Sequence, residues 1–267
     1  MSAPPHRLNY GCNRRLALSE ANVRAENERK SYDEGRVYAQ SRALHSRFEH
    51  VFACPNALRA ERYYHEQIER RIAGAEVLEL GCFDGGKCLR YLGLGPKKFT
   101  GIDISGVLIE KARTRGIDAR VMDAQKLEFP DASLDLVYGG AILHHLDYER
   151  ALREIHRVLR PGGSAIFIEP LRDNPAFKLF RLLTSAARTV DEQPLSREQI
   201  EWSDQLFGRQ QHCYVGLVST GVGALTSFLP LRADNAALRA ADWADRRMER
   251  GALRYWMRQV VLVWEKS

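Results

Sequence analysis

Residues 56–170 alternate short apolar runs with amphipathic helical patterns, and this alternation constrains the fold more than any other feature of the chain. The predicted strands cover 77–80, 99–104, 117–122, 134–138 and 164–168. Strands that alternate with helices through short turns build a parallel sheet with helices on both faces. Such sheets bind ligands at the carboxyl ends of their strands. The residues that directly follow each strand are therefore the first candidates for a functional site.

A helix is predicted ahead of the first strand. Its apolar residues fall four positions apart, which places them on one face: Ala60, Tyr64, Ile68 and Ile72. Asn56 is a residue of the type that caps helix N-termini, and Gly74 of the type that ends helices. We therefore expect Asn56 to begin this helix as its cap.

The flanking regions divide the chain into two parts. Residues 1–55 form a polar, arginine-rich extension with a helix predicted over about 17–50, either a lid over the core or a free tail. Residues 56–267 form the main domain, with a mainly helical cap inserted around 171–255. Apolar patterns in and after the cap predict helices over 174–190, 200–207, 215–228 and 236–248, a short strand near 212–217 and a final strand over 259–265.

The charge of the chain gives little reason to expect a nucleic-acid partner. Lys and Arg number 40 against 34 Asp and Glu, a net charge of +6. Basic residues mostly alternate with acidic ones, as in 24–30, which is typical of solvated helix faces. We therefore expect nucleic acid to be an unlikely partner.

Other partners and the cell compartment are judged from what the sequence lacks. The first ten residues have no apolar segment typical of a secretory signal, and no run of about 18 apolar residues occurs. The five cysteines are scattered and form no Cys-x-x-Cys pair. We expect a cytoplasmic protein with free thiols, no membrane insertion and no bound metal. The sequence does not determine whether the protein forms a homo-oligomer.

The turn after the first predicted strand carries the strongest signal for a ligand. Its sequence, 79–86 (ELGCFDGG), lets backbone amides approach a ligand closely, but it is not the Gly-x-Gly-x-x-Gly of nicotinamide and flavin sites. The carboxylate of Glu79 suits a ligand with an ammonium group better than a pyrophosphate. The alternative is a glycine turn that serves only strand-to-helix packing.

Two acidic residues end the next two predicted strands. Asp103 lies about twenty positions after the turn, where a carboxylate accepts hydrogen bonds from ribose hydroxyls. Asp123 and Ala124 follow the third strand, where an acid and a backbone amide suit the edge of an adenine. Apolar packing against that base is expected from Phe83, Ile104 and Val121. The alternative for Asp103 is a helix-capping or exposed aspartate.

These segments stand in the order seen in class I S-adenosylmethionine-dependent methyltransferases, and the chain most resembles their ubiquinone/menaquinone-type small-molecule branch. The resemblance rests on 77–85 (VLELGCFDG), 101–105 (GIDIS), 122–124 (MDA), 134–138 (LDLVY), 143–146 (LHHL) and 159–163 (LRPGG). It implies an α/β, Rossmann-like doubly wound sheet of seven mostly parallel strands with an antiparallel last strand, flanked by helical N-terminal and C-terminal cap segments.

The resemblance also implies S-adenosyl-L-methionine as cofactor and S-adenosyl-L-homocysteine as product. Carried over to this sequence, the turn lines the methionine end, Asp103 holds the ribose, and Asp123 with Ala124 holds the adenine. The cofactor-binding residues expected in this way are Glu79, Gly81, Cys82, Phe83, Gly85, Asp103, Ile104, Asp123, Ala124 and Gly139. Phe83 departs from the pattern because it replaces a glycine, and a phenylalanine does not easily take a positive φ.

Catalytic candidates follow the fourth and fifth predicted strands. His144 and His145 follow the fourth strand, beside the expected position of the reactive methyl. Glu169 follows the fifth strand on the same rim, where it could bind a polar group of the acceptor or position a cation. Imidazole is a common base where an acceptor loses a proton. The alternative is that the two histidines only close the start of the next helix. The segment 188–192 is an acceptor-binding loop or a plain surface loop.

From these observations we expect transfer of a methyl group to oxygen, nitrogen or carbon of a small-molecule metabolite, with secondary-metabolite biosynthesis as the suggested setting. The main alternative is a scaffold of this fold that binds S-adenosylmethionine without methylating. A nicotinamide-dependent oxidoreductase is disfavoured by the turn. Amino-methylating nucleic-acid enzymes have Asn-Pro-Pro-Tyr after the fourth strand, where this chain has Tyr138, Gly139, Gly140 and Ala141.

Overall fold

The computed structural model describes residues 26–27, 29–30, 33, 36–183 and 192–267. Its centre is a single eight-stranded sheet in the order β3-β2-β1-β4-β5-β8-β6, with β7 also paired to β8. The strands are β1 Glu76–Leu80, β2 Lys98–Asp103, β3 Ala119–Val121, β4 Leu134–Gly140, β5 Leu159–Pro170, β6 Gly208–Gln210, β7 Cys213–Val215 and β8 Gln259–Lys266. The first five strands are mutually parallel and β8 runs antiparallel to β5, so the predicted fold class is confirmed.

The strand number differs from the expected seven for a local reason. β6 pairs with β8 from Gly208 opposite Lys266, and β7 pairs with the same strand from Cys213 opposite Val261. Both pairings are antiparallel, so β6 and β7 are successive pieces of one interrupted edge strand. The final strand predicted over 259–265 and the short strand predicted near 212–217 are both present.

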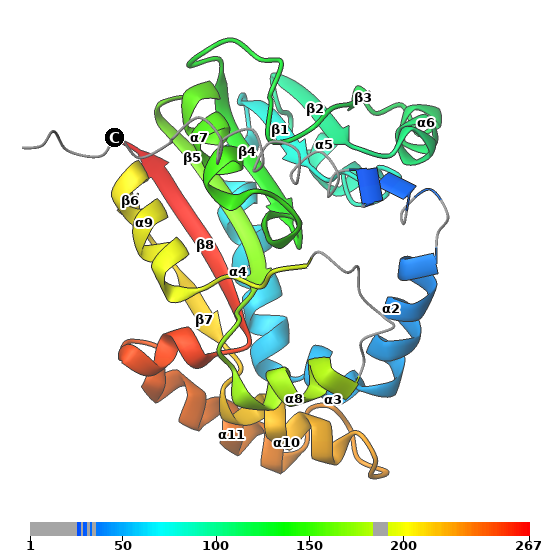
Figure 1. Cartoon of the computed structure of the whole chain (residues 1–267), viewed down its shortest axis with the longest axis vertical. Coiled ribbons are helices and arrows are strands. Elements are labelled where there is room, and N and C mark those ends of the chain that lie inside the picture. Colours follow the sequence, from blue (N-terminus) through cyan, green and yellow to red (C-terminus); the bar gives the residue numbers. More distant parts are fainter. Residues whose placement is uncertain (1–25, 28, 31–32, 34–35, 184–191) are drawn as a thin grey trace, which may run out of the picture.

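Helices cover both faces of the sheet (Figure 1). β1 alternates its side chains, so Leu78 and Leu80 pack in the cluster with α7 and α9, while Val77 packs in the cluster with α4. The helices of the core are α4 Pro55–Ile72, α5 Leu89–Leu92, α6 Gly106–Thr114, η1 Leu143–His145, α7 Tyr148–Val158 and α9 Arg197–Phe207. The remaining helices are α2 Arg36–Arg47, α3 Glu49–Phe52, α8 Pro175–Leu183, α10 Val218–Thr226, α11 Ala236–Met248 and η3 Ala252–Trp256.

The predicted helix over 17–50 and the one over 174–190 extend partly outside the described residues. Where the structure describes them, both segments contain helix, as α2 and α8. Ser105 caps α6 by accepting a hydrogen bond from the Leu108 amide at 3.2 Å, as its type predicts. The corresponding prediction for Asn56 is wrong, because α4 begins at Pro55 with Cys54 as its N-cap.

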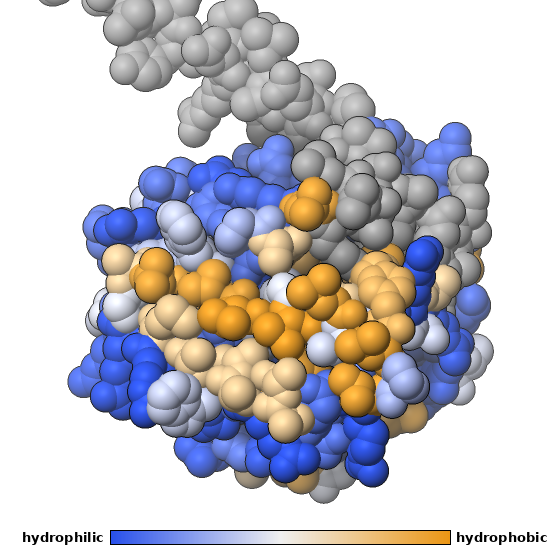
Figure 2. All heavy atoms as spheres, turned by 90° about the horizontal axis from the view of Figure 1, so that it is seen from below, coloured by the Kyte–Doolittle hydropathy of each residue, from blue (hydrophilic) through white to orange (hydrophobic). Residues whose placement is uncertain are grey.

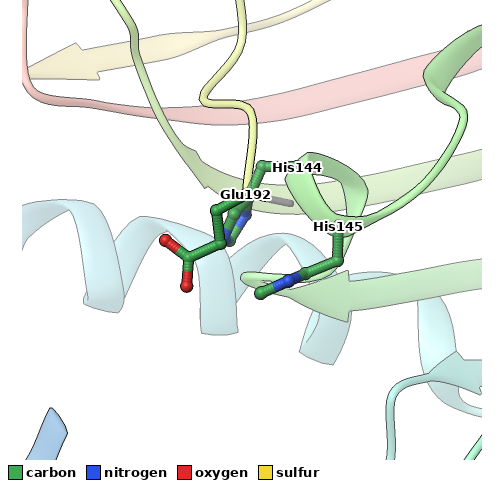
Figure 3. A group of neighbouring side chains, drawn as sticks. All are labelled: His144, His145 and Glu192. Atoms are coloured by element: carbon green, nitrogen blue, oxygen red, sulfur yellow. The ribbon is translucent and has the colours of Figure 1, made fainter. Parts of the chain in front are cut away.

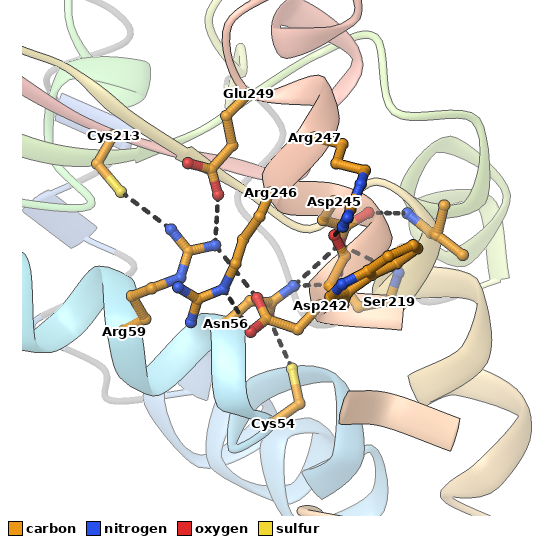
Figure 4. A network of polar contacts seen from close by, with 12 residues as sticks. Cys54, Asn56, Arg59, Cys213, Ser219, Asp242, Asp245, Arg246, Arg247 and Glu249 are labelled. Carbon is orange, nitrogen blue, oxygen red and sulfur yellow. Dashed lines mark hydrogen bonds and ion pairs between the residues drawn. The ribbon is translucent and has the colours of Figure 1, made fainter. Parts of the chain in front are cut away.

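Asn56 instead belongs to a buried polar network that joins α4 to α10 and α11 (Figure 4). Its amide nitrogen donates to the Ser219 hydroxyl and, at 3.2 Å, to a carboxylate oxygen of Asp245. One turn further along α4, Arg59 forms ion pairs with Asp242 at 3.2 Å and Glu249 at 2.5 Å. The network therefore fixes the position of α10 and α11 at one end of the sheet.

The lower end of the molecule carries many of its exposed apolar side chains. Viewed from below, an apolar belt crosses this face between polar margins (Figure 2). Large exposed apolar residues on or beside α8, α10, α11 and η3 are Leu179, Leu225, Phe228, Leu229, Leu231, Trp243, Leu253 and Trp256. Among the described residues, no helix is both long and apolar enough to span a membrane.

Candidate active site

The turn after β1 takes the course expected of a glycine-rich ligand-binding turn. Gly81, Phe83 and Gly85 all have positive φ, at 66°, 54° and 75°. Phe83 thus adopts the left-handed conformation that a glycine would take without strain, at a cost of about 1–2 kcal/mol. Its amide donates to the Asp103 carboxylate at 3.1 Å, which helps to hold this conformation. The turn thus keeps a residue of positive φ at the position where the family pattern has a glycine.

Both carboxylate oxygens of Asp103, at the end of β2, accept backbone hydrogen bonds, one of them from the turn. Oδ1 accepts from the Ser105 amide at 2.9 Å, and Oδ2 accepts from the Phe83 amide at 3.1 Å. Burial raises the pKa of Asp103, while these amide bonds act in the opposite direction. Each oxygen has a second lone pair, so the carboxylate can still accept hydrogen bonds from ribose hydroxyls. Ser105 also donates to Asp33 of the N-terminal segment, which therefore reaches this edge of the sheet.

The predicted adenine-binding residues lie next to this edge. Asp123 follows β3, which pairs with β2 up to Asp103 opposite Val121. The Asp123 carboxylate accepts from the Gln125 amide at 2.8 Å, and Ala124 is buried beside it. The structure thus brings Asp103, Asp123 and the β1 turn together, although they come from three separate strands. Val121 is 54% exposed, so its packing against the base stays a prediction.

Three of the predicted cofactor residues also make close contacts within the protein. A Cβ on Gly139 would lie 2.9 Å from the Leu80 carbonyl oxygen, so β4 approaches β1 too closely for any larger residue. The buried Cys82 side chain packs against Gly101 of β2, and a Cβ on this glycine would lie 2.8 Å from the cysteine sulfur. Glu79 is buried beneath the turn, where its Oε2 accepts from the Cys88 thiol at 2.8 Å and the Tyr138 hydroxyl at 3.0 Å.

Burial raises the pKa of Glu79. A carboxyl whose folded pKa exceeds its unfolded value binds its proton more tightly when folded, so its contribution to stability is lost as pH rises through the folded pKa. We expect Glu79→Gln to melt above the wild type at about pH 8, with the difference shrinking towards about pH 5. Scanning calorimetry at both pH values measures this, with exposed Glu128→Gln as the matched control. A constant difference would contradict the expectation.

The fully buried Glu169 organises the loop after β4. Its Oε1 accepts from the amides of Ile142 and Leu143, both at 2.9 Å, and its Oε2 lies 2.7 Å from Nδ1 of His144. We assign the proton to Nδ1, because a carboxylate only accepts, and Nε2 then carries the basic lone pair of the neutral ring. The loop also contains Ala141 with φ of 56°, a strained conformation of the kind found at functional sites. The cap of the next helix is Asp147, so the histidines do not serve that purpose.

His144, His145 and Glu192 form a compact group beside this loop (Figure 3). Each side chain offers one possible ligand atom, these three atoms all lie within 4.8 Å of one another, and the centres of the two imidazole rings lie 4.1 Å apart. The segment that carries Glu192 is held by a hydrogen bond from the Gln193 amide to the His144 carbonyl at 2.8 Å. Two imidazoles and a carboxylate also occur together in divalent-metal sites. This group of side chains is not apparent from the sequence, and the expectation that no metal is bound stays a prediction.

The family comparison agrees with this arrangement. Residues 78–167 match the family model described as a methyltransferase domain. The chain contains a class I S-adenosylmethionine-dependent methyltransferase domain. The matched region runs from β1 to β5, so this domain includes the turn, both strand-end aspartates and the histidine pair.

Curated relatives of the methyltransferase domain act on different kinds of acceptor. 27-O-demethylrifamycin SV methyltransferase of Amycolatopsis mediterranei is 39% identical over 100 residues, 34% of this chain and 37% of that protein. tRNA (carboxymethyluridine(34)-5-O)-methyltransferase of Arabidopsis thaliana is 37% identical over 101 residues, 36% of this chain and 24% of that protein. The matches thus span well under half of the length of these relatives.

Among solved structures, geranyl diphosphate C-methyltransferase from Streptomyces coelicolor A3(2), in complex with Mg²⁺, geranyl diphosphate and S-adenosyl-L-homocysteine, is similar in fold. The TM-score is 0.53 at 15% sequence identity, and the alignment covers 81% of this chain and 82% of that one. The similarity includes much of the chain outside the methyltransferase domain.

Proposed function

We propose that this protein transfers a methyl group from S-adenosylmethionine to a small-molecule acceptor and releases S-adenosylhomocysteine. The observation that carries the proposal is the juxtaposition of Asp103 and Asp123 with the left-handed turn after β1, within the matched domain. In this assignment Asp103 binds the ribose hydroxyls, Asp123 and Ala124 bind the adenine, and the turn at 81–85 approaches the methionine portion. The cofactor supplies a methyl group on a sulfonium sulfur, which leaves as a neutral thioether.

The loop after β4 is assigned to the acceptor. When an oxygen or nitrogen acceptor is methylated, the bond from carbon to sulfur breaks, the bond from carbon to the acceptor forms, and the acceptor loses a proton. We assign that proton to Nε2 of His144, while Glu169 holds the Nδ1–H and stabilises the charged ring. His144 therefore acts as the base, and Glu169 is a positioning residue.

Burial around the histidines supports a small acceptor. His144 and His145 are 6% and 8% exposed, and Glu169 is 0% exposed. A compact molecule reaches such groups more readily than a folded nucleic acid does, and the rifamycin-related enzyme acts on a small molecule by its name. The relative named for tRNA favours an RNA acceptor as the second candidate. Methylation assays with total tRNA and with a small-molecule library separate the two, and labelled tRNA without labelled small molecules would overturn the first.

Titration calorimetry with S-adenosylhomocysteine tests the cofactor site. We expect micromolar binding by the wild type and at least about tenfold weaker binding by Asp103→Ala, a loss of about 1.4 kcal/mol. The matched control is Asp131→Ala, because Asp131 is exposed and precedes β4 at the opposite edge of the sheet. A folded wild type that does not bind, or equal weakening in both variants, would contradict the assignment.

A further inference from the structure

Arg258, which directly precedes β8, is a buried cation without a counter-ion among the described residues. It is 6% exposed, and within this part of the chain its side chain makes one hydrogen bond, from Nη2 to Oε1 of Gln259 at 3.2 Å. No carboxylate of the described residues forms an ion pair with it, in contrast to Arg59, which is paired with Asp242 and Glu249. Charged groups are rarely buried without a partner, because removing an ion from water costs several kcal/mol. An unpaired buried guanidinium therefore indicates a missing anion.

The backbone places Arg258 at the carboxyl edge of the sheet, next to the end of β5 that carries Glu169. Its carbonyl accepts from the Leu171 amide at 2.8 Å, and Leu171 lies two residues after Glu169, which holds His144. Its own amide donates to the carbonyls of Val215 and Gly216, at 3.1 and 3.0 Å. Arg258 is thus fixed to the same end of β5 as the proposed base.

The side chain of Arg258 runs towards the N-terminal helices. A Cβ on Gly216 would lie 3.1 Å from Cβ and 3.4 Å from Nε of Arg258, so this glycine leaves room for the arginine to pass. The guanidinium carbon lies 5.6 Å from the centre of the Phe52 ring in α3. Phe52 in turn stacks on His45 of α2, with ring centres 3.9 Å apart.

Among the described residues, the titratable groups that interact with Arg258 are positive or neutral. Burial lowers the pKa of His45, and the positive charges of Arg258 and Lys87 lower it further. Lys87 directly follows the glycine-rich turn, so the positive charges of Arg258 and of a residue next to the cofactor turn both act on His45. The thiol of Cys54 is the other group that interacts with Arg258, and burial raises its pKa, which keeps it neutral. These groups attract an anion and do not neutralise the arginine.

We propose that Arg258 forms a subsite for an anionic group of the methyl acceptor, a carboxylate or a phosphate. The inference rests on the proposed function, because it places the anion on Arg258 and the nucleophilic atom at His144. A guanidinium suits this role because its parallel N–H groups bind two oxygens of a planar carboxylate or a phosphate at once. Acceptors are then acids, and their neutral esters are poor substrates.

Thermal unfolding of Arg258→Met separates a binding role from a structural one. We expect this variant to melt at or above the wild-type temperature, because the methionine removes an unpaired buried charge and keeps most of the volume. Sodium phosphate and sodium benzoate, compared with sodium chloride at equal ionic strength, should stabilise the wild type and not the variant. The matched control is Arg172→Met, an arginine of the same rim whose side chain is 54% exposed. A lower melting temperature with unchanged anion stabilisation would assign Arg258 to structure and overturn the proposal.

A second measurement concerns the acceptor itself. In a screen that pairs carboxylic acids with their methyl esters, we expect the wild type to favour acids about tenfold or more, and Arg258→Met to lose that preference. Equal rates for acids and esters with the wild type would contradict the subsite. S-adenosylhomocysteine should bind equally well to the wild type and to Arg258→Met. If the cofactor-site assignment is wrong, this titration shows it, whereas an error in the anion-subsite proposal leaves the titration unchanged.

Discussion

Replacing His144 with alanine is expected to lower the turnover of an oxygen or nitrogen acceptor by about 10²–10⁴-fold, the usual effect of losing a general base. The reason is that Glu169 lies 2.7 Å from Nδ1, which directs the basic lone pair to Nε2. Transfer of radiolabelled methyl to an acceptor found in the acid screen measures the effect. Affinity for S-adenosylhomocysteine should stay within about twofold, because cofactor binding is assigned to other strand ends.

Glu169→Gln tests whether the carboxylate acts through His144. The amide keeps an oxygen for the Ile142 and Leu143 amides but turns an NH₂ donor towards Nδ1 of His144, which favours the ring tautomer with its proton on Nε2 and disfavours the charged ring. We expect a lower kcat with little change in KM, and a pH–rate profile that moves, since the base would lose its charged partner. A loss of melting temperature that accounts for the whole effect would show that Glu169 serves only the fold.

The methyl-transfer assay also tests whether the reaction depends on a bound metal ion. His144, His145 and Glu192 also resemble a divalent-metal donor set. A chelator should leave wild-type turnover unchanged if His144 acts as a base. Loss of turnover with the chelator and its return with one divalent metal would overturn the base assignment in favour of a bound cation.

The parts of the site that follow from local pattern could be predicted from the sequence. Asp103 ends β2 and Asp123 follows β3, and parallel strands bring their carboxyl ends to one edge. The same reasoning placed His144 and Glu169 on that edge, and the structure shows that they are hydrogen-bonded to each other. Local periodicity thus identifies which residues reach the edge, whatever their distance along the chain.

Residues whose role depends on a distant neighbour escaped this reasoning. Glu192 is far from the histidine pair in the sequence and comes close to it only in the folded chain. Arg258 is unusual because it is buried with no acidic partner among the described residues, and a sequence does not display burial. Phe83 looked incompatible with its turn, but a hydrogen bond to Asp103 accompanies the left-handed conformation. Asn56 has the chemistry of a helix cap, yet tertiary contacts with Ser219 and Asp245 determine its place.

Those contacts lead to the prediction with the largest effect on stability. Asp245 is 0% exposed, and its carboxylate accepts four hydrogen bonds, from the Val218 amide at 2.7 Å, the Ser219 amide at 3.3 Å, the Ser219 hydroxyl at 2.5 Å and Asn56 at 3.2 Å. It therefore caps the start of α10 from α11 while binding α4. Removing it leaves several buried donors without an acceptor.

Asp245→Ala is expected to lower the free energy of unfolding by about 3–5 kcal/mol, because each unsatisfied buried donor costs about 1–3 kcal/mol and local rearrangement recovers part of the total. Urea unfolding monitored by circular dichroism measures the loss. Asp245→Asn keeps one acceptor oxygen and should lose less, whereas Asp234→Ala, at a side chain 51% exposed before α11, should change stability by under about 0.5 kcal/mol. A loss under about 1 kcal/mol for Asp245→Ala would mean that the network does not hold α10 and α11 on α4.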